Sequence, residues 1–312
     1  MGAVNSAAVI AVEWALLGIC LALVLARLHL RLHLQLKRPI LSDYCICLAW
    51  LCGIWGAVLD IELEKLGWLS PATTWFDFLS NTPNTDLTIK IAFSSWFPLF
   101  AVQYLSKAAL LSFFFHIFPS VLRTFLYLLW TVAIFSILSF ITSILLVLLI
   151  CLPQTSSGNS HGLCSANNSL IIWTSTWALH FSSDIFIFCL PFFILRIIRL
   201  AWKRKIALYV TFGFGIFSIG TCIGRLLTVL ITYPDVPTTT LELWCALDIF
   251  TGLIVACLPS LRPYLTLNTG PSQSIPLNAG QQRLCSNFSG LTNSPSILSE
   301  VYSREQTNRE LG

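Results

Sequence analysis

The sequence predicts an all-helical, polytopic membrane protein in which seven transmembrane helices form a bundle. The first observation is composition, because 56% of the 312 residues are hydrophobic and only 10% are charged. Soluble domains carry about 25% charged residues. The second observation is that the apolar residues gather in seven segments, each long enough to cross a hydrocarbon layer about 30 Å thick. One soluble core cannot cover so much apolar surface, so the lipid bilayer is the expected partner.

The predicted spans and domains follow from this pattern. The spans are residues 4–26, 42–63, 89–117, 121–150, 169–196, 206–232 and 239–262. No basic residue precedes the first run, and the run is longer than the apolar core of a signal peptide, so it is predicted to be a span. Residues 1–265 therefore form the membrane domain. Residues 266–312 are rich in Ser, Asn, Thr, Gly and Pro and are predicted to form a disordered cytoplasmic tail.

The basic residues predict the orientation of the chain. The first, third and fifth connections and the tail hold fourteen of the 18 Lys and Arg residues, whereas the second, fourth and sixth connections hold two. Because cytoplasmic loops are enriched in Lys and Arg, we expect an extracellular N-terminus and a cytoplasmic C-terminus, in the plasma membrane. The most basic connection, 196–205, is the predicted docking site for a cytoplasmic signalling partner. Basic residues flank the spans and form no separate domain, so nucleic-acid binding is not expected.

Ionisable residues inside the spans are the candidate functional residues. A charge at the bilayer centre costs about 2.5–3.5 kcal/mol on insertion scales, so such residues face the bundle and find partners. Depths counted from the helix ends predict an Arg225–Asp248 pair in the outer half and a deeper Lys107–Asp184 pair. The predicted pocket and charge network comprises Glu13, Lys107, His180, Asp184, Arg225 and Asp248, with Asp60 near the outer end of the second span. Two interpretations remain open, in which these charges either hold helices together or bind and switch.

The loop "CLPQTSSGNSHGLC" is predicted to lie on the outer face over the bundle mouth. Cys151 and Cys164 bracket it, and the oxidising side of the membrane favours a disulfide between them. The alternative is two free cysteines. Asn167, in the sequon "NNS", is a candidate glycosylation site on the same side.

Three prolines, Pro98, Pro191 and Pro259, lie inside predicted spans. A proline removes one hydrogen bond of the helix and clashes with the preceding turn, so each predicts a kink.

The stretch "RLHLRLHLQL" places His29 and His33 four residues apart, a spacing that allows metal binding on a helix. No third ligand accompanies them, and a basic segment touching anionic lipid is the preferred interpretation. We therefore predict no metal site and no other cofactor.

Several familiar classes do not fit the motifs. Segment 239–262 has no lysine for a retinal Schiff base, and the third span ends in "FFFHIFP" rather than Asp-Arg-Tyr. The last span ends in "CLPSLRPYL", without Asn-Pro-x-x-Tyr. Seven spans alone do not define an opsin or an ordinary G-protein-coupled receptor. No catalytic constellation is present, so we do not expect an enzyme.

Four motifs, in this order and spacing, resemble the fungal rhodopsin-domain family of seven-helix membrane proteins, which includes the Pth-eleven-like receptors. They are "YLSKAALLSFFFHIF", "CLP…GLC", "SDIFIFCLPFFIL" and "LWCALDIFTGLIVACLPSLRPYL". The resemblance covers roughly residues 42–265. This chain departs from the family where His116 replaces an arginine and Asp248 replaces a glutamate.

The resemblance and the intramembrane charges predict a receptor-like protein. It would sense an extracellular or membrane-borne small molecule and signal through its cytoplasmic loops. The expected pocket lies in the outer half, under the 151–164 loop, and its predicted lining is Glu13, His180, Asp184, Arg225 and Asp248. The aromatic content suggests an apolar ligand. The alternative function is a transporter or an accessory membrane protein of a fungal metabolite pathway.

Overall fold

The chain divides into two units, Met1–Leu267 and Asn268–Gly312. The computed structural model describes residues within the first unit only. These residues are 4–34, 40–70, 85–117, 123–155, 166–197, 202–232 and 236–261, some of them at helix ends by their backbone alone. The tail predicted at 266–312 lies outside the described residues.

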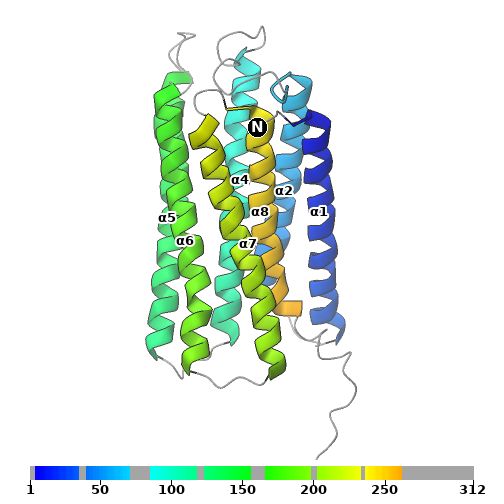
Figure 1. Cartoon of the computed structure of the whole chain (residues 1–312), viewed down its shortest axis with the longest axis vertical. Helices are drawn as coiled ribbons and strands as arrows, with labels where there is room; N and C mark the ends of the chain where they lie inside the picture. Colours follow the sequence, from blue (N-terminus) through cyan, green and yellow to red (C-terminus); the bar gives the residue numbers. More distant parts are fainter. Residues whose placement is uncertain are drawn as a thin grey trace, which may run out of the picture. The chain divides into compact units, whose positions relative to one another are not determined.

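The described residues form seven long helices and no strand, which confirms the all-α prediction (Figure 1). A π-helical turn, η1 (Leu30–Leu34), continues the first helix, and a 3-10 turn, η2 (Leu258–Leu261), follows the last. The long helices are α1 (Ser6–His29), α2 (Leu41–Lys65), α4 (Thr85–Ile117), α5 (Arg123–Thr155), α6 (Ala166–Ile197), α7 (Trp202–Thr232) and α8 (Thr238–Cys257).

Over the residues whose side chains are described, six helices, α1, α2, α4, α5, α7 and α8, are long and apolar enough to cross a membrane. The chain is therefore a multi-pass membrane protein. The crossing by α6 and the orientation of the termini stay predictions.

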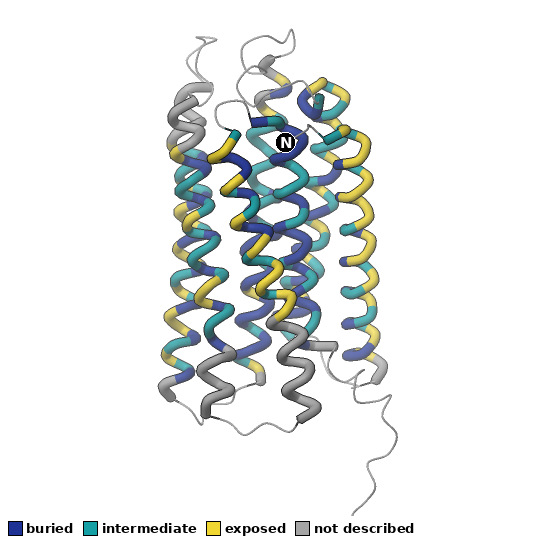
Figure 2. The backbone as a smooth tube through the Cα atoms, viewed as in Figure 1, coloured by how far each residue is buried: buried dark blue, intermediate teal, exposed yellow. Residues whose placement is uncertain are grey.

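The helices pack as a closed ring. Each helix packs against its neighbour in the chain, from α1–α2 through α7–α8, and α1 packs against α8 to complete the ring. Helix α4 also contacts α6 and α8. In the spans of α4 and α8, 61% and 67% of residues are buried, against 22–28% in the other spans (Figure 2). Side chains of α4 and α8 therefore dominate the bundle interior.

The outward faces carry large apolar side chains. Trp130, Ile137 and Ile231 are 55%, 59% and 76% exposed. Apolar exposure over several helices is unfavourable in water and suits a lipid environment.

At the end of the bundle where α1 meets α2, Asp43 holds two arginines. Its carboxylate accepts from Arg27 Nε at 2.8 Å, from Arg31 Nη1 at 2.7 Å and from the backbone N–H of Ile40 at 2.9 Å. Arg27 and Arg31 were expected in a connection that touches lipid, and this prediction was wrong. Both are helical and buried, because Asp43 in the first turn of α2 supplies a charge partner that lipid headgroups would otherwise provide.

Arg27 extends this cluster to two further helices. Its Nη1 donates to the carbonyl of Ala256 in the last turn of α8 at 3.0 Å, where carbonyls lack helical donors. Its Nη2 donates to Ser42 Oγ at 2.6 Å, and that hydroxyl donates to the Ala109 carbonyl of α4 at 2.7 Å. The Asp43 cluster, comprising Arg27, Arg31, Ser42 and Asp43, therefore joins α1, α2, α4 and α8.

The three prolines have different surroundings. Helix α4 continues through Pro98. Pro259 does not lie within the last helix as predicted, because α8 ends at Cys257 and Pro259 belongs to η2. Proline lacks the N–H that would continue the α-helical ladder, so this position ends the helix. Pro191 lies in α6, where only the backbone is described.

We predict that Arg27→Met lowers the free energy of unfolding by about 3 kcal/mol, because it leaves buried acceptors without their donor. Thermal unfolding of the purified protein measures this change. The control is Lys65→Met, which breaks an exposed pair with Glu62 and should cost less than about 0.5 kcal/mol. Equal effects of the two substitutions would contradict a structural role for the Asp43 cluster.

Helix α7 approaches α8 closely at Gly224. A Cβ atom there would lie 2.7 Å from Cη2 of Trp244. We predict that Gly224→Ala destabilises the protein by about 1–3 kcal/mol through overpacking. Gly220→Ala, on the same helix with nothing within 4 Å, is the matched control and should be neutral or slightly stabilising. Thermal unfolding compares them, and a neutral Gly224→Ala would show that the α7–α8 contact yields easily.

Candidate functional site

Five ionisable side chains, four of them buried and Asp184 half-buried, form one series of contacts, which we name the charge chain. Lys107 Nζ lies 3.1 Å from Asp184 Oδ1, and His180 Nε2 lies 3.1 Å from Asp184 Oδ2. On its other side His180 Nε2 lies 3.4 Å from Asp248 Oδ2, and Arg225 Nη2 lies 3.2 Å from the same oxygen. Both predicted pairs are present, and His180 joins them, so α4, α6, α8 and α7 share one network.

Lys107 defines how His180 bonds. Its ammonium nitrogen lies 2.8 Å from His180 Nδ1, 2.8 Å from the His180 carbonyl and 2.5 Å from Ser183 Oγ. An ammonium group only donates, so Nδ1 accepts and the proton of a neutral imidazole resides on Nε2. That Nε2–H faces the carboxylates of Asp184 and Asp248. Two cations, two anions and a neutral imidazole leave the charge chain balanced inside the bundle.

The Arg225–Asp248 end of the charge chain is less completely bonded. Asp248 Oδ2 also lies 3.4 Å from Gln103 Nε2, whereas its buried Oδ1 accepts no hydrogen bond from the described residues. Arg225 Nη1 lies 3.8 Å from Cys245 Sγ, and its guanidinium carbon lies 5.8 Å from the centre of the Trp173 ring. The buried Nε of Arg225 donates to no acceptor in the described part of the chain. Buried polar atoms are normally paired, so Asp248 Oδ1 and Arg225 Nε could each still form a hydrogen bond with another group.

A cavity of about 80 Å³ lies beside Arg225, within the first halves of α4 and α8. This is the half predicted to be extracellular. Its wall includes Glu13, Asp60, Trp68, Trp96, Trp173, Trp177, Arg225 and Glu242. Glu13 and Arg225 therefore line the cavity as predicted. His180, Asp184 and Asp248 do not belong to the wall of this cavity, because their side chains bond to one another and to Lys107 and Arg225.

Three carboxyl groups converge on the cavity from three helices. Glu13 of α1 is 4% exposed and lies close to Asp60 of α2 in the wall of the cavity. Glu242 of α8 is close enough to act electrostatically on Glu13. The sequence analysis missed Glu242, because a charge so near the start of a span is ordinarily interfacial. The signal was available, since Glu242, Cys245 and Ile249 follow the helical spacing of one face and all line the cavity.

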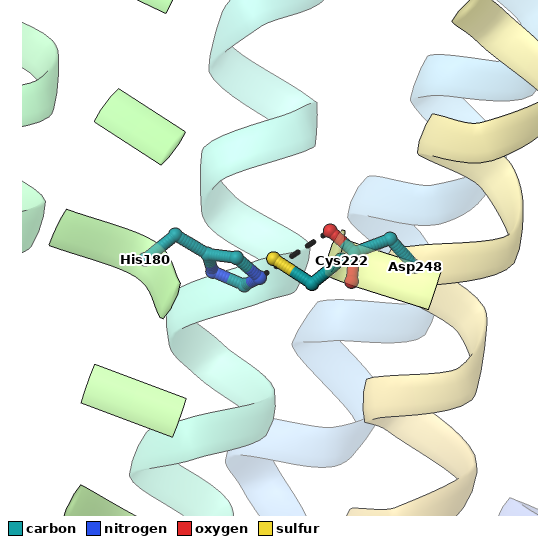
Figure 3. Close-up of side chains that lie close together, drawn as sticks. All are labelled: His180, Cys222 and Asp248. Carbon is teal, nitrogen blue, oxygen red and sulfur yellow. Dashed lines mark ion pairs between the residues drawn. The ribbon is translucent and has the colours of Figure 1, made fainter. Parts of the chain in front are cut away.

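His180, Cys222 and Asp248 also form a possible metal-ligand set, which the sequence analysis did not predict. Their ligand atoms lie within 4.8 Å of one another, and they point together from α6, α7 and α8 (Figure 3). These are ligand types that zinc accepts. A metal on Nε2 would need the nitrogen that here carries a proton, and it would sit beside the cations Lys107 and Arg225. We therefore assign these residues to the charge chain and its surroundings.

The remaining predicted sites lie largely outside the described side chains. Cys151 belongs to α5 and Asn167 to the first turn of α6, both by backbone only, and Cys164 lies outside the described residues. The disulfide and the glycosylation stay predictions. So do the covering role of the 151–164 loop and the partner at 196–205.

The fold and site define a class of protein, a polytopic helical membrane protein with a buried charge network beside an internal cavity. The fungal rhodopsin domain matches residues 26–267, which is most of the chain. The chain therefore belongs to the fungal rhodopsin domain family, in agreement with the resemblance of its motifs. No curated protein and no solved structure gives a significant match.

The Lys107–Asp184 contact predicts non-additive mutational effects. Lys107→Met and Asp184→Asn should each destabilise the protein, because each leaves a buried group without its charge partner. The double variant should be more stable than the sum of the two losses predicts, by about 1–3 kcal/mol, in thermal unfolding. Lys107→Met combined with Glu62→Gln, a distant exposed residue, should be additive within about 0.5 kcal/mol. Additivity of the Lys107–Asp184 cycle would show that the ion pair contributes nothing.

Proposed function

We propose that this chain is a non-enzymatic, receptor-like membrane protein that binds a small molecule in the cavity and passes the signal to the cytoplasmic side. The observation that carries this proposal is the position of Arg225. It belongs to the wall of the cavity and is also one end of the charge chain. A group bound in the cavity can therefore act on the charge chain through a single side chain.

The chemistry of this junction supports a two-state response. A ligand that attracts or repels the Arg225 guanidinium changes its 3.2 Å contact with Asp248. The contact between Asp248 and His180 would then strengthen or weaken, and this changes the contact that His180 also makes with Asp184. A ligand shifts a conformational equilibrium only when it interacts differently with the two states, and this junction supplies such a difference.

Helices α4 and α6 are the natural route to the other end of the bundle. Lys107 lies ten residues before the end of α4 at Ile117, and Asp184 lies thirteen residues before the end of α6 at Ile197. A change in their ion pair alters how these two helices pack. Helix α6 leads directly into the basic connection 196–205, the proposed contact for a cytoplasmic partner.

The packing beyond the cavity favours a receptor over a transporter. Phe250, Leu253 and Ala256 of α8 follow the cavity-lining turn and are each at most 1% exposed, within the largest apolar core. A transporter needs a route to the opposite side at some stage of its cycle, and this route would have to open through that core. Uptake into vesicles is the measurement that would support transport.

Cysteine protection tests ligand binding at this cavity. Cys52 of α2 lines the cavity, whereas Cys45 of the same helix does not, and both are partly exposed. Compounds selected by thermal shift from a diverse collection should slow the reaction of N-ethylmaleimide with Cys52 and leave Cys45 unchanged. Arg225→Gln should remove both effects, since it removes the cavity's only described cation. Failure of every compound to stabilise the protein or protect Cys52 would contradict the proposed function.

A further inference from the structure

We propose that the ligand of this cavity carries an organic ammonium group next to a hydrogen-bond acceptor, the arrangement found in an amino alcohol. This inference rests on the proposed function and names its ligand class. It starts from Glu13, Asp60 and Glu242, which approach the cavity from α1, α2 and α8. They are far apart in the sequence, and only the fold brings them to one space.

In the described wall of the cavity, three acidic groups lie beside a single cation, Arg225. Within the described residues none of them takes part in an ion pair, and the ion pair of Arg225 is formed with Asp248. All three side chains line the cavity, so a bound group can reach their carboxyl oxygens. A buried carboxylate without a partner is costly, and an ammonium group supplies both the positive charge and several N–H donors.

The aromatic part of the wall suits the same group. Trp68, Trp96, Trp173 and Trp177 line the cavity. Tryptophan faces attract cations more strongly than the faces of other aromatic residues, and cages of aromatic rings with carboxylates recognise ammonium groups. The wall already holds one cation in this way, since Arg225 lies over Trp173.

Arg225 is the second, independent indication of a ligand. Its side chain is 5% exposed, and its Nε donates to no acceptor among the described residues. Because Arg225 lines the same cavity, the ligand that satisfies Nε must present an oxygen or another acceptor. The apolar ligand expected from aromatic content alone does not meet these two polar requirements.

The volume limits the size of the group that binds. The cavity measures about 80 Å³. An apolar cavity of about 150 Å³ accommodates benzene, so the group that fits here is no larger than about one six-membered ring. A branched amine of a few carbon atoms, free or as the end of a longer molecule, is of suitable size.

Three probes of nearly equal shape test the inference on the full-length chain in lipid nanodiscs. Aminomethylpropanol has a quaternary carbon that bears an ammonium, a hydroxymethyl and two methyl groups. Neopentyl alcohol replaces the ammonium with a methyl group, and tert-amylamine replaces the hydroxyl with one. At equal ionic strength we expect aminomethylpropanol to raise Tm most, tert-amylamine less, and neopentyl alcohol least. They should slow the labelling of Cys52 by N-ethylmaleimide in the same order.

Matched variants identify the groups responsible. Glu13→Gln and Glu242→Gln should each raise the half-saturating concentration of aminomethylpropanol about tenfold, the loss expected for one charge-assisted hydrogen bond. Glu62→Gln, an exposed carboxylate outside the cavity, should leave it unchanged. Because these substitutions can also alter folding, each variant is compared with its own ligand-free Tm.

Two results would overturn the inference. The inference requires aminomethylpropanol to raise Tm more than neopentyl alcohol does, so equal stabilisation by the two would reject the ammonium requirement. Absence of any response to all three probes would reject the ligand class. In either case, protection of Cys52 by neutral or anionic compounds from the diverse collection would leave the proposed function standing, so the two failures are distinguishable.

Discussion

Every charge inside this bundle is constrained by the cost of leaving it without a partner. Asp248, with a side chain that is fully buried, is held by Arg225 of a neighbouring helix and by His180 of another. A partner on the same helix would satisfy the charge without fixing any packing. Here the ion pairs of Lys107 with Asp184 and of Arg225 with Asp248 join different helices, so the requirement for neutrality also sets which helices meet and at what depth.

Two clusters meet this constraint to different degrees. The carboxylate of Asp43 receives two guanidinium groups and a backbone N–H, and Arg27 distributes its remaining donors over α2 and α8. The charge chain instead leaves Asp248 Oδ1 and Arg225 Nε without partners in the described residues. A fully bonded network has one favoured arrangement, whereas an incompletely bonded one has alternatives of similar energy. The Asp43 cluster is therefore suited to act as a fixed point, and the end of the charge chain near the cavity is suited to rearrange.

The sequence predicts this fold well because membrane spans and intramembrane charges are strong local signals. Depth counting was sufficient to pair Lys107 with Asp184 and Arg225 with Asp248, since opposite charges at similar depth have few other partners. It could not show that His180 joins the pairs, because this depends on the rotation of α6 about its axis. Arg27 was misplaced for a related reason. Its partner Asp43 lies sixteen residues away across a turn, and the basic pattern of the segment is also typical of a lipid-facing connection.

If the proposed ligand binds in the cavity, its charge would determine the direction in which the charge chain responds. An anion would attract the Arg225 guanidinium and draw it away from Asp248, leaving that buried carboxylate to rely on His180. A cation held by Glu13, Asp60 and Glu242 would instead repel the guanidinium and press it toward Asp248. The second response leaves the new charge paired, because the cation meets carboxyl groups that had no ion pair among the described residues. A bound cation would therefore favour a closer contact between Arg225 of α7 and Asp248 of α8, two helices that already pack tightly where Gly224 faces Trp244.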